Sequence, residues 1–360
     1  MKIKLQSRRR GIALIIVMIV IAILAVLAGN FAASMKVETI LARNASFDSE
    51  FEWLGRSGIE VARGVLSEVK DPYIALNQKW AGGLGDTNGA FSDADLHHFP
   101  VGDTGRFLDI EIEDQERYFN INVADEVILH QALTLIGVDA AQQPTIVDSI
   151  LDWRDPDDNP HMSGTESSDY KSAPFLPHVA KNGPLDDLSE LLLIRGIMEQ
   201  PQIYSRAFAS PGASMISRHS RLGASKFEEV AYETTMSDLF TTLSGRLINI
   251  NTASAKVLQL IPEIDENLAN AIVSGPGGRN GPDGAPNTPD DTPFRGVQEL
   301  GRVMPANPQA LAMLSRFFGV QSLVFKVNVK VELGGMQRTY HAYLRRNSPR
   351  DIQMLCMDWD

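Results

Sequence analysis

The densest group of chemically active side chains is an acidic segment, residues 152–170. It begins Asp-Trp-Arg-Asp-Pro-Asp-Asp-Asn-Pro and ends Gly-Thr-Glu-Ser-Ser-Asp-Tyr. Clustered carboxylates, an asparagine and the more distant Glu166 offer the oxygen ligands that Ca²⁺ prefers, and Pro156 and Pro160 stiffen the loop. The glycine that an EF-hand loop needs at its sixth position is absent. On spacing alone, a solvated acidic loop is the simpler interpretation.

A second acidic loop, residues 279–293, contains Asp283, Asp290 and Asp291 among several glycines and prolines. Such a composition occurs both at ion sites and in flexible linkers, so both interpretations stay open. Zinc is not expected at the first segment, where no cysteine occurs and His161 is the single nearby histidine.

The sequence contains no recognisable set of catalytic residues. Paired carboxylates can serve hydrolases, but the seven histidines are scattered and neither Gly-x-Ser-x-Gly nor His-Glu-x-x-His occurs. Cys356 is the one cysteine, so no internal disulfide can form. We therefore expect a protein that is not an enzyme.

The N-terminus combines a basic head with a long apolar run. Lys2, Lys4 and residues 8–10 (Arg-Arg-Arg) precede 25 uncharged residues, 11–35. This run is long enough to cross a bilayer as a helix, and the positive-inside rule keeps the basic head in the cytoplasm. Three interpretations compete: a cleaved signal peptide, a plain membrane anchor, and cleavage between Gly11 and Ile12 that retains the apolar segment.

The residues after this run favour retention of the apolar segment. Apolar side chains recur every three or four positions from Val37 to Val69, and charged residues fill the other face. No proline occurs before Pro72, so one helix can continue from Ile12 to Val69. At 1.5 Å per residue it would be about 87 Å long. A cleaved signal peptide has no reason to continue in phase into such a helix.

The chain is acidic and longer than one small domain. Its 360 residues suggest two or three units, and its formal charge is −12. Loss of the five basic residues before Ile12 would leave a formal charge of −17. Nucleic-acid binding depends largely on cationic contacts to phosphate, so this balance disfavours nucleic acid as a partner.

Two distant parts of the chain predict one antiparallel sheet. Residues 71–105 indicate a loop with little regular structure. Alternating apolar and polar residues predict two strands before residue 122 and a hairpin near the C-terminus, with Gly334-Gly335 as its turn. The predicted strands are residues 106–113, 117–121, 323–333 and 337–345. We expect them to pack together on the polar half of the long helix.

The intervening residues are predicted to be helical and contain a repeat. Residues 120–124 are Asn-Ile-Asn-Val-Ala, and residues 249–253 are Asn-Ile-Asn-Thr-Ala. A helix, a short turn and another helix follow each copy, as in helix-hairpin-helix modules. The expected helices are 127–136 and 144–153 in the first copy, and 255–261 and 266–273 in the second. Asp139 and Asp265 stand in the turns where a phosphate-binding module has glycine, so we expect a packing scaffold.

The residues around Gly11 resemble the type IV pilins and pseudopilins, which have a short basic leader, a glycine and a long apolar helix. The resemblance implies peptidase cleavage between Gly11 and Ile12. Most members of the class have glutamate at the fifth mature position, which is Ile16 here. The minor pseudopilin K family (GspK) of type II secretion systems lacks it, and the chain is identified as similar to that family.

The resemblance implies an α+β pilin-like fold, a long N-terminal helix packed on an antiparallel sheet, with a large all-helical insertion containing two helix-hairpin-helix-like repeats. The implied domains follow. They are a leader (1–11), a membrane-spanning helix (12–70), a sheet (71–121 and 321–360) and an inserted helical domain (122–320, with repeats at about 120–200 and 249–305).

GspK proteins share an Asp-Trp-x-Asp-x-Asp stretch with a later Gly-x-Glu, and they bind calcium in the insertion. The resemblance therefore implies a structural calcium site with Asp155, Asp157, Asp158 and Glu166 as ligands, and Asp152 in a capping or supporting position. Gly164 and Tyr170 of this chain also match the family pattern.

The implied function is that of a minor pseudopilin at the tip of the type II secretion pseudopilus, which caps and primes the filament for protein export. Expected partners are the I and J minor pseudopilins, the major pseudopilin and the prepilin peptidase. The expected location is the inner membrane, with a single span and a periplasmic soluble domain. A minor pilin of a type IV pilus and a membrane-tethered DNA-binding protein are the alternatives.

Overall fold

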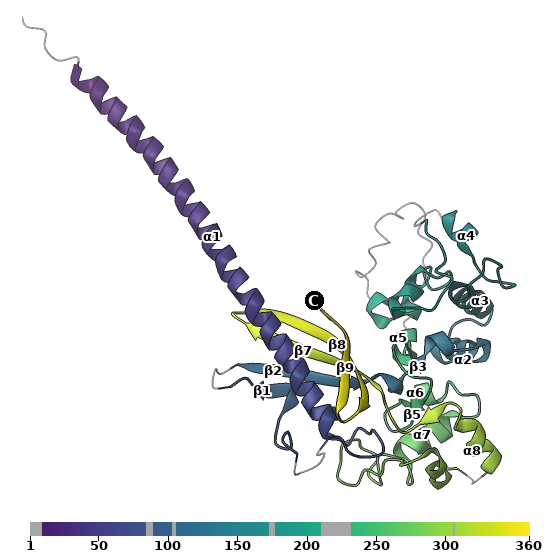
Figure 1. Ribbon diagram of the computed structural model, residues 1–360. Coiled ribbons are helices and arrows are strands. Elements are labelled where there is room, and N and C mark those ends of the chain that lie inside the picture. Colours follow the sequence, from purple (N-terminus) through teal and green to yellow (C-terminus); the bar gives the residue numbers. More distant parts are fainter. Residues whose placement is uncertain (1–8, 84–88, 103–105, 173–176, 210–231, 305–306) are drawn as a thin grey trace, which may run out of the picture.

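A single helix, α1 (Arg9–Glu68), dominates the molecule and extends far beyond the rest of it (Figure 1). The computed structural model describes residues 9–83, 89–102, 106–172, 177–209, 232–304 and 307–360. The large apolar side chains between Leu14 and Leu41 are exposed, whereas Phe51, Leu54 and Leu66 are buried. Among the described residues, α1 is the one helix long and apolar enough to cross a membrane. The continuous helix predicted from Ile12 onward is present.

The lower half of α1 packs on a five-stranded antiparallel sheet of order β1-β2-β7-β8-β9 (Figure 1). The strands are β1 (Phe99–Pro100), β2 (Phe107–Asp114), β7 (Val324–Leu333), β8 (Met336–Ser348) and β9 (Asp351–Trp359). Strand β2 alternates buried apolar with polar residues, so it contributes Leu108, Ile110 and Ile112 to the shared core. The 3-10 helices η1 (Lys79–Ala81) and η2 (Leu96–His98) place Trp80 and Leu96 in the same core.

Glycines let α1 approach the sheet closely. A Cβ atom at Gly55 would overlap the Tyr340 ring, and one at Gly58 would overlap Val329. Because neither glycine has a side chain, the helix can lie this close to the sheet. Glycine lowers the helix propensity at both positions.

The C-terminal hairpin formed as predicted. Strands β7 and β8 pair from Val324 with Arg345 to Leu333 with Met336, and Gly334 and Gly335 have φ values of 59° and 79°. Both values are positive, as a two-residue type I′ turn requires.

Three sheet predictions need correction. The predicted strand 117–121 is instead a 3-10 turn, η3 (Gln115–Arg117), and a two-residue strand, β3 (Phe119–Asn120), that pairs with β4 (Phe240–Thr241) outside the main sheet. The predicted loop 71–105 contains β1, η1 and η2. Strand β9 was not predicted, because exposed and half-exposed residues replace the expected alternation along it.

A second hydrophobic core lies beside the sheet and is mostly helical (Figure 1). Its α-helices are α2 (Glu126–Ile136), α3 (Gln143–Arg154), α4 (Ser167–Lys171), α5 (Met236–Leu239), α6 (Ala255–Leu258), α7 (Glu266–Ser274) and α8 (Pro308–Leu314). Its 3-10 helices are η4 (Ile121–Val123), η5 (Leu188–Leu193), η6 (Pro201–Ile203), η7 (Arg206–Ala209) and η8 (Val297–Arg302). Strands β5 (Ile248–Asn249) and β6 (Phe318–Gly319) pair in parallel within it. We call this part the helical unit.

The two Asn-Ile-Asn motifs make matching contacts in the helical unit. Asn122 exchanges two hydrogen bonds with the backbone of Leu185, and Asn251 does the same with Phe294. An arginine also donates to a motif carbonyl in each copy: the half-buried Arg154 to Ile121, and the buried Arg279 to Ile250. The internal repeat in the sequence thus coincides with two equivalent sets of side-chain-to-backbone contacts.

Candidate metal centre

The acidic segment forms a cluster where helix α3 ends. Asp152 lies on the last turn of α3, and Asp155 follows as the C-cap before Pro156, which prevents continuation of the helix. The chain then returns so that Glu166 begins α4. Ligand atoms of Asp152, Asp155 and His161 all lie within 4.8 Å of one another.

The cluster contains several buried oxygen atoms that have no hydrogen-bond donor. These atoms are Asp152 Oδ2, Asp155 Oδ1, both carboxylate oxygens of Glu166, and Asn182 Oδ1. Asp152 is fully buried and Glu166 is 1% exposed. A buried acceptor left without a partner costs about 1–3 kcal/mol, and more when it is charged. Five such oxygens from four residues form the kind of donor set that a hard cation satisfies.

Electrostatic repulsion among the acids also acts in the cluster. Burial raises the pKa of Asp155 and of Glu166, and the neighbouring carboxylate of Asp152 raises both further. A hydrogen bond to Asp152 raises the pKa of His161, whose half-exposed ring lies at the rim. Mutual repulsion among the acids favours binding of a cation between them.

Gly164 makes the close packing of this loop possible. A Cβ atom at this position would overlap the Asp152 carboxylate. The glycine of the Gly-x-Glu stretch therefore allows the backbone to approach Asp152 where no other residue fits.

The structure brings together only part of the predicted ligand set. Asp155 and Glu166 turn unpartnered oxygens inward, and Asp152 does so as well, although the sequence suggested a supporting position for it. Asp157 and Asp158 are exposed. Asp157 Oδ1 accepts from the Asn159 N–H at 2.8 Å, and Asp158 Oδ1 accepts from Asn182 Nδ2 at 3.0 Å.

Sequence reasoning missed Asn182, which approaches the cluster from outside the acidic segment. Its side-chain amide donates to the Asp157 carbonyl at 2.8 Å and leaves Oδ1 buried without a donor. Its backbone has a φ of 50°, a left-handed conformation that asparagine tolerates better than most residues. The one sequence signal is the Asn-Gly pair at residues 182–183, which marks a turn but not a ligand.

The second acidic loop is organised by its own hydrogen bonds. Asp290 accepts from the Asp283 N–H and from Thr288, and Asp291 accepts from the Asn287 N–H at 2.9 Å. Asp283 accepts from the Ala285 N–H at 2.8 Å. None of these three carboxylates has a buried oxygen without a partner. The interior of this loop therefore gives no independent support for an ion site.

The aspartates of the two predicted turns accept backbone hydrogen bonds. Asp265 is the N-cap of α7 and accepts from the Leu268 N–H at 2.8 Å, whereas Asp139 accepts from the Ala141 N–H at 3.0 Å in the turn before α3, whose N-cap is Gln142. At the start of α7, a carboxylate therefore occupies a backbone donor that a phosphate would need.

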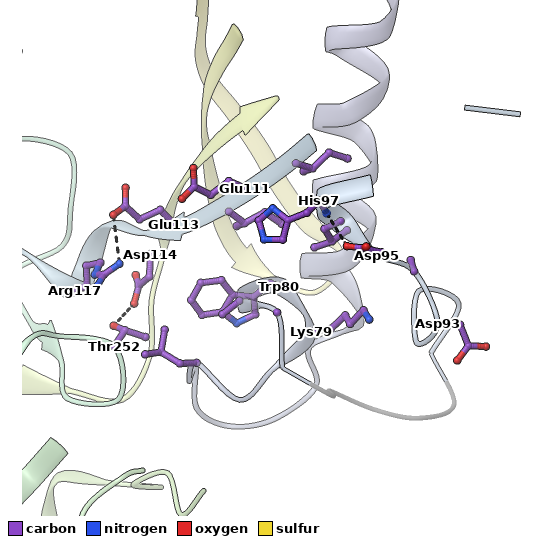
Figure 2. Close-up of a pocket in the computed structure, with 17 residues that line it drawn as sticks. Lys79, Trp80, Asp93, Asp95, His97, Glu111, Glu113, Asp114, Arg117 and Thr252 are labelled. Atoms are coloured by element: carbon purple, nitrogen blue, oxygen red, sulfur yellow. Dashed lines mark hydrogen bonds and ion pairs between the residues drawn. The ribbon is translucent and has the colours of Figure 1, made fainter. Parts of the chain in front are cut away.

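A polar pocket of about 500 Å³ lies between strand β2, the segment that contains η1 and η2, and Thr252 (Figure 2). Five carboxylates line it, and Arg117 pairs with Glu113 at 3.4 Å on its wall. The charged groups on the wall are thus partly matched within the protein.

Three comparisons with known proteins lead to the proteins of type II secretion systems. The family model described as "Type II secretion system (T2SS), protein K" matches residues 111–206. A curated type II secretion system protein K from Escherichia coli K12 is 26% identical over 218 residues, 56% of this chain. The match spans 62% of that relative, less than two thirds of its length.

A structural comparison shows a shared fold. The crystal structure of the GspK-GspI-GspJ complex from enterotoxigenic Escherichia coli matches with a TM-score of 0.61 and 17% identity. The match covers 89% of this chain and 99% of that one, so the two share a fold over nearly their whole length. Together, the comparisons confirm the predicted resemblance to protein K (GspK) of type II secretion systems.

Proposed function

We propose that this protein is a minor pseudopilin that caps the tip of a type II secretion pseudopilus and primes its assembly for protein export. The observation that carries this proposal is the division of α1. Its first half exposes apolar side chains, while its second half packs on the sheet in one uninterrupted helix. Such a helix suits a filament subunit that is held in a membrane before assembly, and we infer a pilin-like fold from it.

The N-terminal half of α1 supports a position at the tip. In the proposed mature chain, Ile12 is the first residue and Ile16 the fifth, and Ile16 is 56% exposed. An isoleucine cannot neutralise the terminal amine of a neighbouring subunit, as the usual glutamate does. The proposed cleavage between Gly11 and Ile12 by a prepilin peptidase would leave one span in the inner membrane and the remaining domains in the periplasm.

The proposed partners are the I and J minor pseudopilins, with the major pseudopilin below them in the filament. The similar solved chain belongs to a GspK-GspI-GspJ complex, which supports this choice. The test is co-expression of the full chain with candidate I and J proteins, followed by affinity capture and size-exclusion chromatography. We expect a stable complex with one copy of each; failure of both proteins to co-purify, while they still bind each other, would contradict the proposal.

We also propose that the cluster at the end of α3 holds a structural calcium ion. Asp152, Asp155, Glu166 and Asn182 would supply oxygen ligands, and the ion would join α3, its following loop and the Asn182 turn. Binding to the folded state alone would stabilise it by about 2.7 kcal/mol at a hundredfold excess over the dissociation constant. Titration of Ca²⁺ against the melting temperature tests this, and an unchanged melting temperature would exclude the proposal.

The two alternatives have simple tests. A minor pilin of a type IV pilus would be encoded among pilus genes, whereas the comparisons favour type II secretion. A DNA-binding protein would shift duplex DNA in a gel at low salt. We expect no shift, because of the acidic charge and the carboxylates in both turns. We also propose that the chain is not an enzyme, which an assay for hydrolysis by the purified protein would test.

A further inference from the structure

Two buried carboxyl groups, Asp114 and Glu116, lie where the sheet meets the helical unit. The chain leaves the sheet at the end of β2, enters the helical unit through η3, and returns through residues 320–324 to begin β7. Asp114 is 1% exposed and Glu116 is 2% exposed. Neither belongs to the metal cluster or to the proposed membrane and filament surfaces, so their role is separate from the proposed function.

Asp114 connects three parts of the chain through one carboxylate oxygen. Oδ2 accepts hydrogen bonds from Thr252 Oγ1, from Ser322 Oγ at 2.7 Å and from Asn249 Nδ2 at 3.3 Å. Figure 2 shows the Asp114 side chain directed at Thr252. Asn249, the first residue of the second Asn-Ile-Asn motif, also donates to the Ile74 carbonyl just after α1. This one oxygen therefore joins the sheet, the helical unit and the returning strand.

Glu116 makes a second bridge of the same kind. Oε1 accepts from the Gly245 N–H at 2.9 Å, on the helical unit, and Oε2 accepts from the Val324 N–H at 3.0 Å, at the start of β7. The outgoing and returning connections are thus bonded to each other and to the helical unit by the same pair of acids.

No cation of the described residues makes a hydrogen bond to the pair. The charged or titratable side chains on the surrounding elements are Asp71, Tyr73, Glu113, Arg117, Arg246, Arg279 and Lys326. Among the described residues, none of these donates a hydrogen bond to either carboxyl: Arg117 pairs with Glu113, Arg279 donates to Ile250, and Arg246 is exposed. Burial therefore raises the pKa of Asp114, and burial together with the Asp114 charge raises the pKa of Glu116 to about 8.

We propose that Asp114 and Glu116 form a carboxyl latch that shares one proton and fixes the helical unit on the sheet, and that loss of this proton releases the two units to reorient. With one proton, the pair has a single negative charge and a full set of donors. A second negative charge in the same buried site is strongly unfavourable. Separation of the two units would expose both carboxylates to water and so relieve this cost.

The direction of the pH effect follows from the raised pKa values. Both groups hold their protons more tightly in the joined arrangement than in water. The latch is therefore most stable below about pH 4, where free carboxyls titrate, and weakens as the pH rises through about 8. The relevant window is neutral to mildly alkaline pH.

The test measures the distance between the two units in the full chain in detergent micelles. Cys356 is the one cysteine and is exposed on β9, so it takes one spin label, and the substitution Glu263→Cys on the exposed turn before α7 provides the second. Pulsed electron spin resonance should give a narrow distance distribution at about pH 6 that broadens by about pH 9, with a midpoint near 8.

Two substitutions on the same strand separate the latch from a general pH effect. Asp114→Asn removes the neighbouring charge and should move the midpoint of the broadening below 8, whereas Glu113→Gln, outside the pair, should leave the midpoint unchanged. If Asp114→Asn prevents folding, Glu116→Gln removes the group whose pKa is about 8 and should abolish the broadening near that pH. An unchanged wild-type distribution over this range, or a midpoint that Asp114→Asn and Glu116→Gln both leave in place, would overturn the proposal.

Discussion

At the scale of single residues, the cluster of oxygens without donors differs from the ligand set that the family resemblance implies. That set includes Asp157 and Asp158 and gives Asp152 a supporting position, because a linear sequence does not show which side chains turn inward. The structure distinguishes them by hydrogen bonding: Asp152 Oδ2 and both oxygens of Glu166 lack donors, while Asp157 accepts from its own loop. The oxygens without a donor are the ones that need a cation.

This difference predicts opposite outcomes for two equivalent substitutions. We expect Asp152→Asn to abolish the rise in melting temperature that Ca²⁺ causes, because it removes a buried charge that faces the other acids. Asp157→Asn should retain most of the rise, since the side chain is exposed and already accepts a hydrogen bond. Calorimetry of both variants with and without Ca²⁺ checks this; the reverse pattern would restore the ligand set that the resemblance implies.

At the scale of elements, periodicity predicted the long and regular parts well. Each of these elements, α1, β2 and β7, buries one face. The apolar residues of that face recur with the period of the helix or strand, so the sequence shows them directly. Short elements escaped prediction because neighbours distant in sequence determine them. Strand β3 has two residues and exists through its pairing with β4, and Asn182 reaches the metal cluster through the tertiary fold.

The close approach of α1 to the sheet gives a prediction at this scale. Gly55→Ala should destabilise the sheet half of the molecule by about 1–3 kcal/mol, because the new methyl group would overlap the Tyr340 ring. Gly29→Ala on the same helix is the matched control, since nothing lies within 4 Å of its Cβ position. Urea unfolding followed by tryptophan fluorescence measures the difference; equal stability of both variants would show that the helix has room to shift.

At the scale of the whole molecule, two hydrophobic cores share one crossing point. The sheet and the second half of α1 enclose one core, and the helical unit encloses the other. The chain passes between them only at η3 and at residues 320–324, within the part that the structure describes, and the carboxyl latch lies at that crossing. The orientation of the helical unit therefore depends on a small number of polar contacts.

The pairing of β2 with β7 also sets the order in which the protein can fold. Leu108 pairs with Val331, so synthesis must deliver the entire helical unit before β2 has its central neighbour. Until then the apolar face of α1 around Leu54 has no sheet to cover it, and closing so long a loop is slow. The last strands complete the part of the protein that was made first.

A chain that stops at Leu323 should separate the two halves. It lacks β7, β8 and β9, and we expect limited proteolysis to remove α1 and β2 while the helical unit resists cleavage. Mass spectrometry of the protected fragments checks this, and protection of β2 without its partner would contradict the expected order. In a cell, the nascent protein would then remain tethered by α1 with an unfinished sheet, exposed to proteases and chaperones until its final strands emerge.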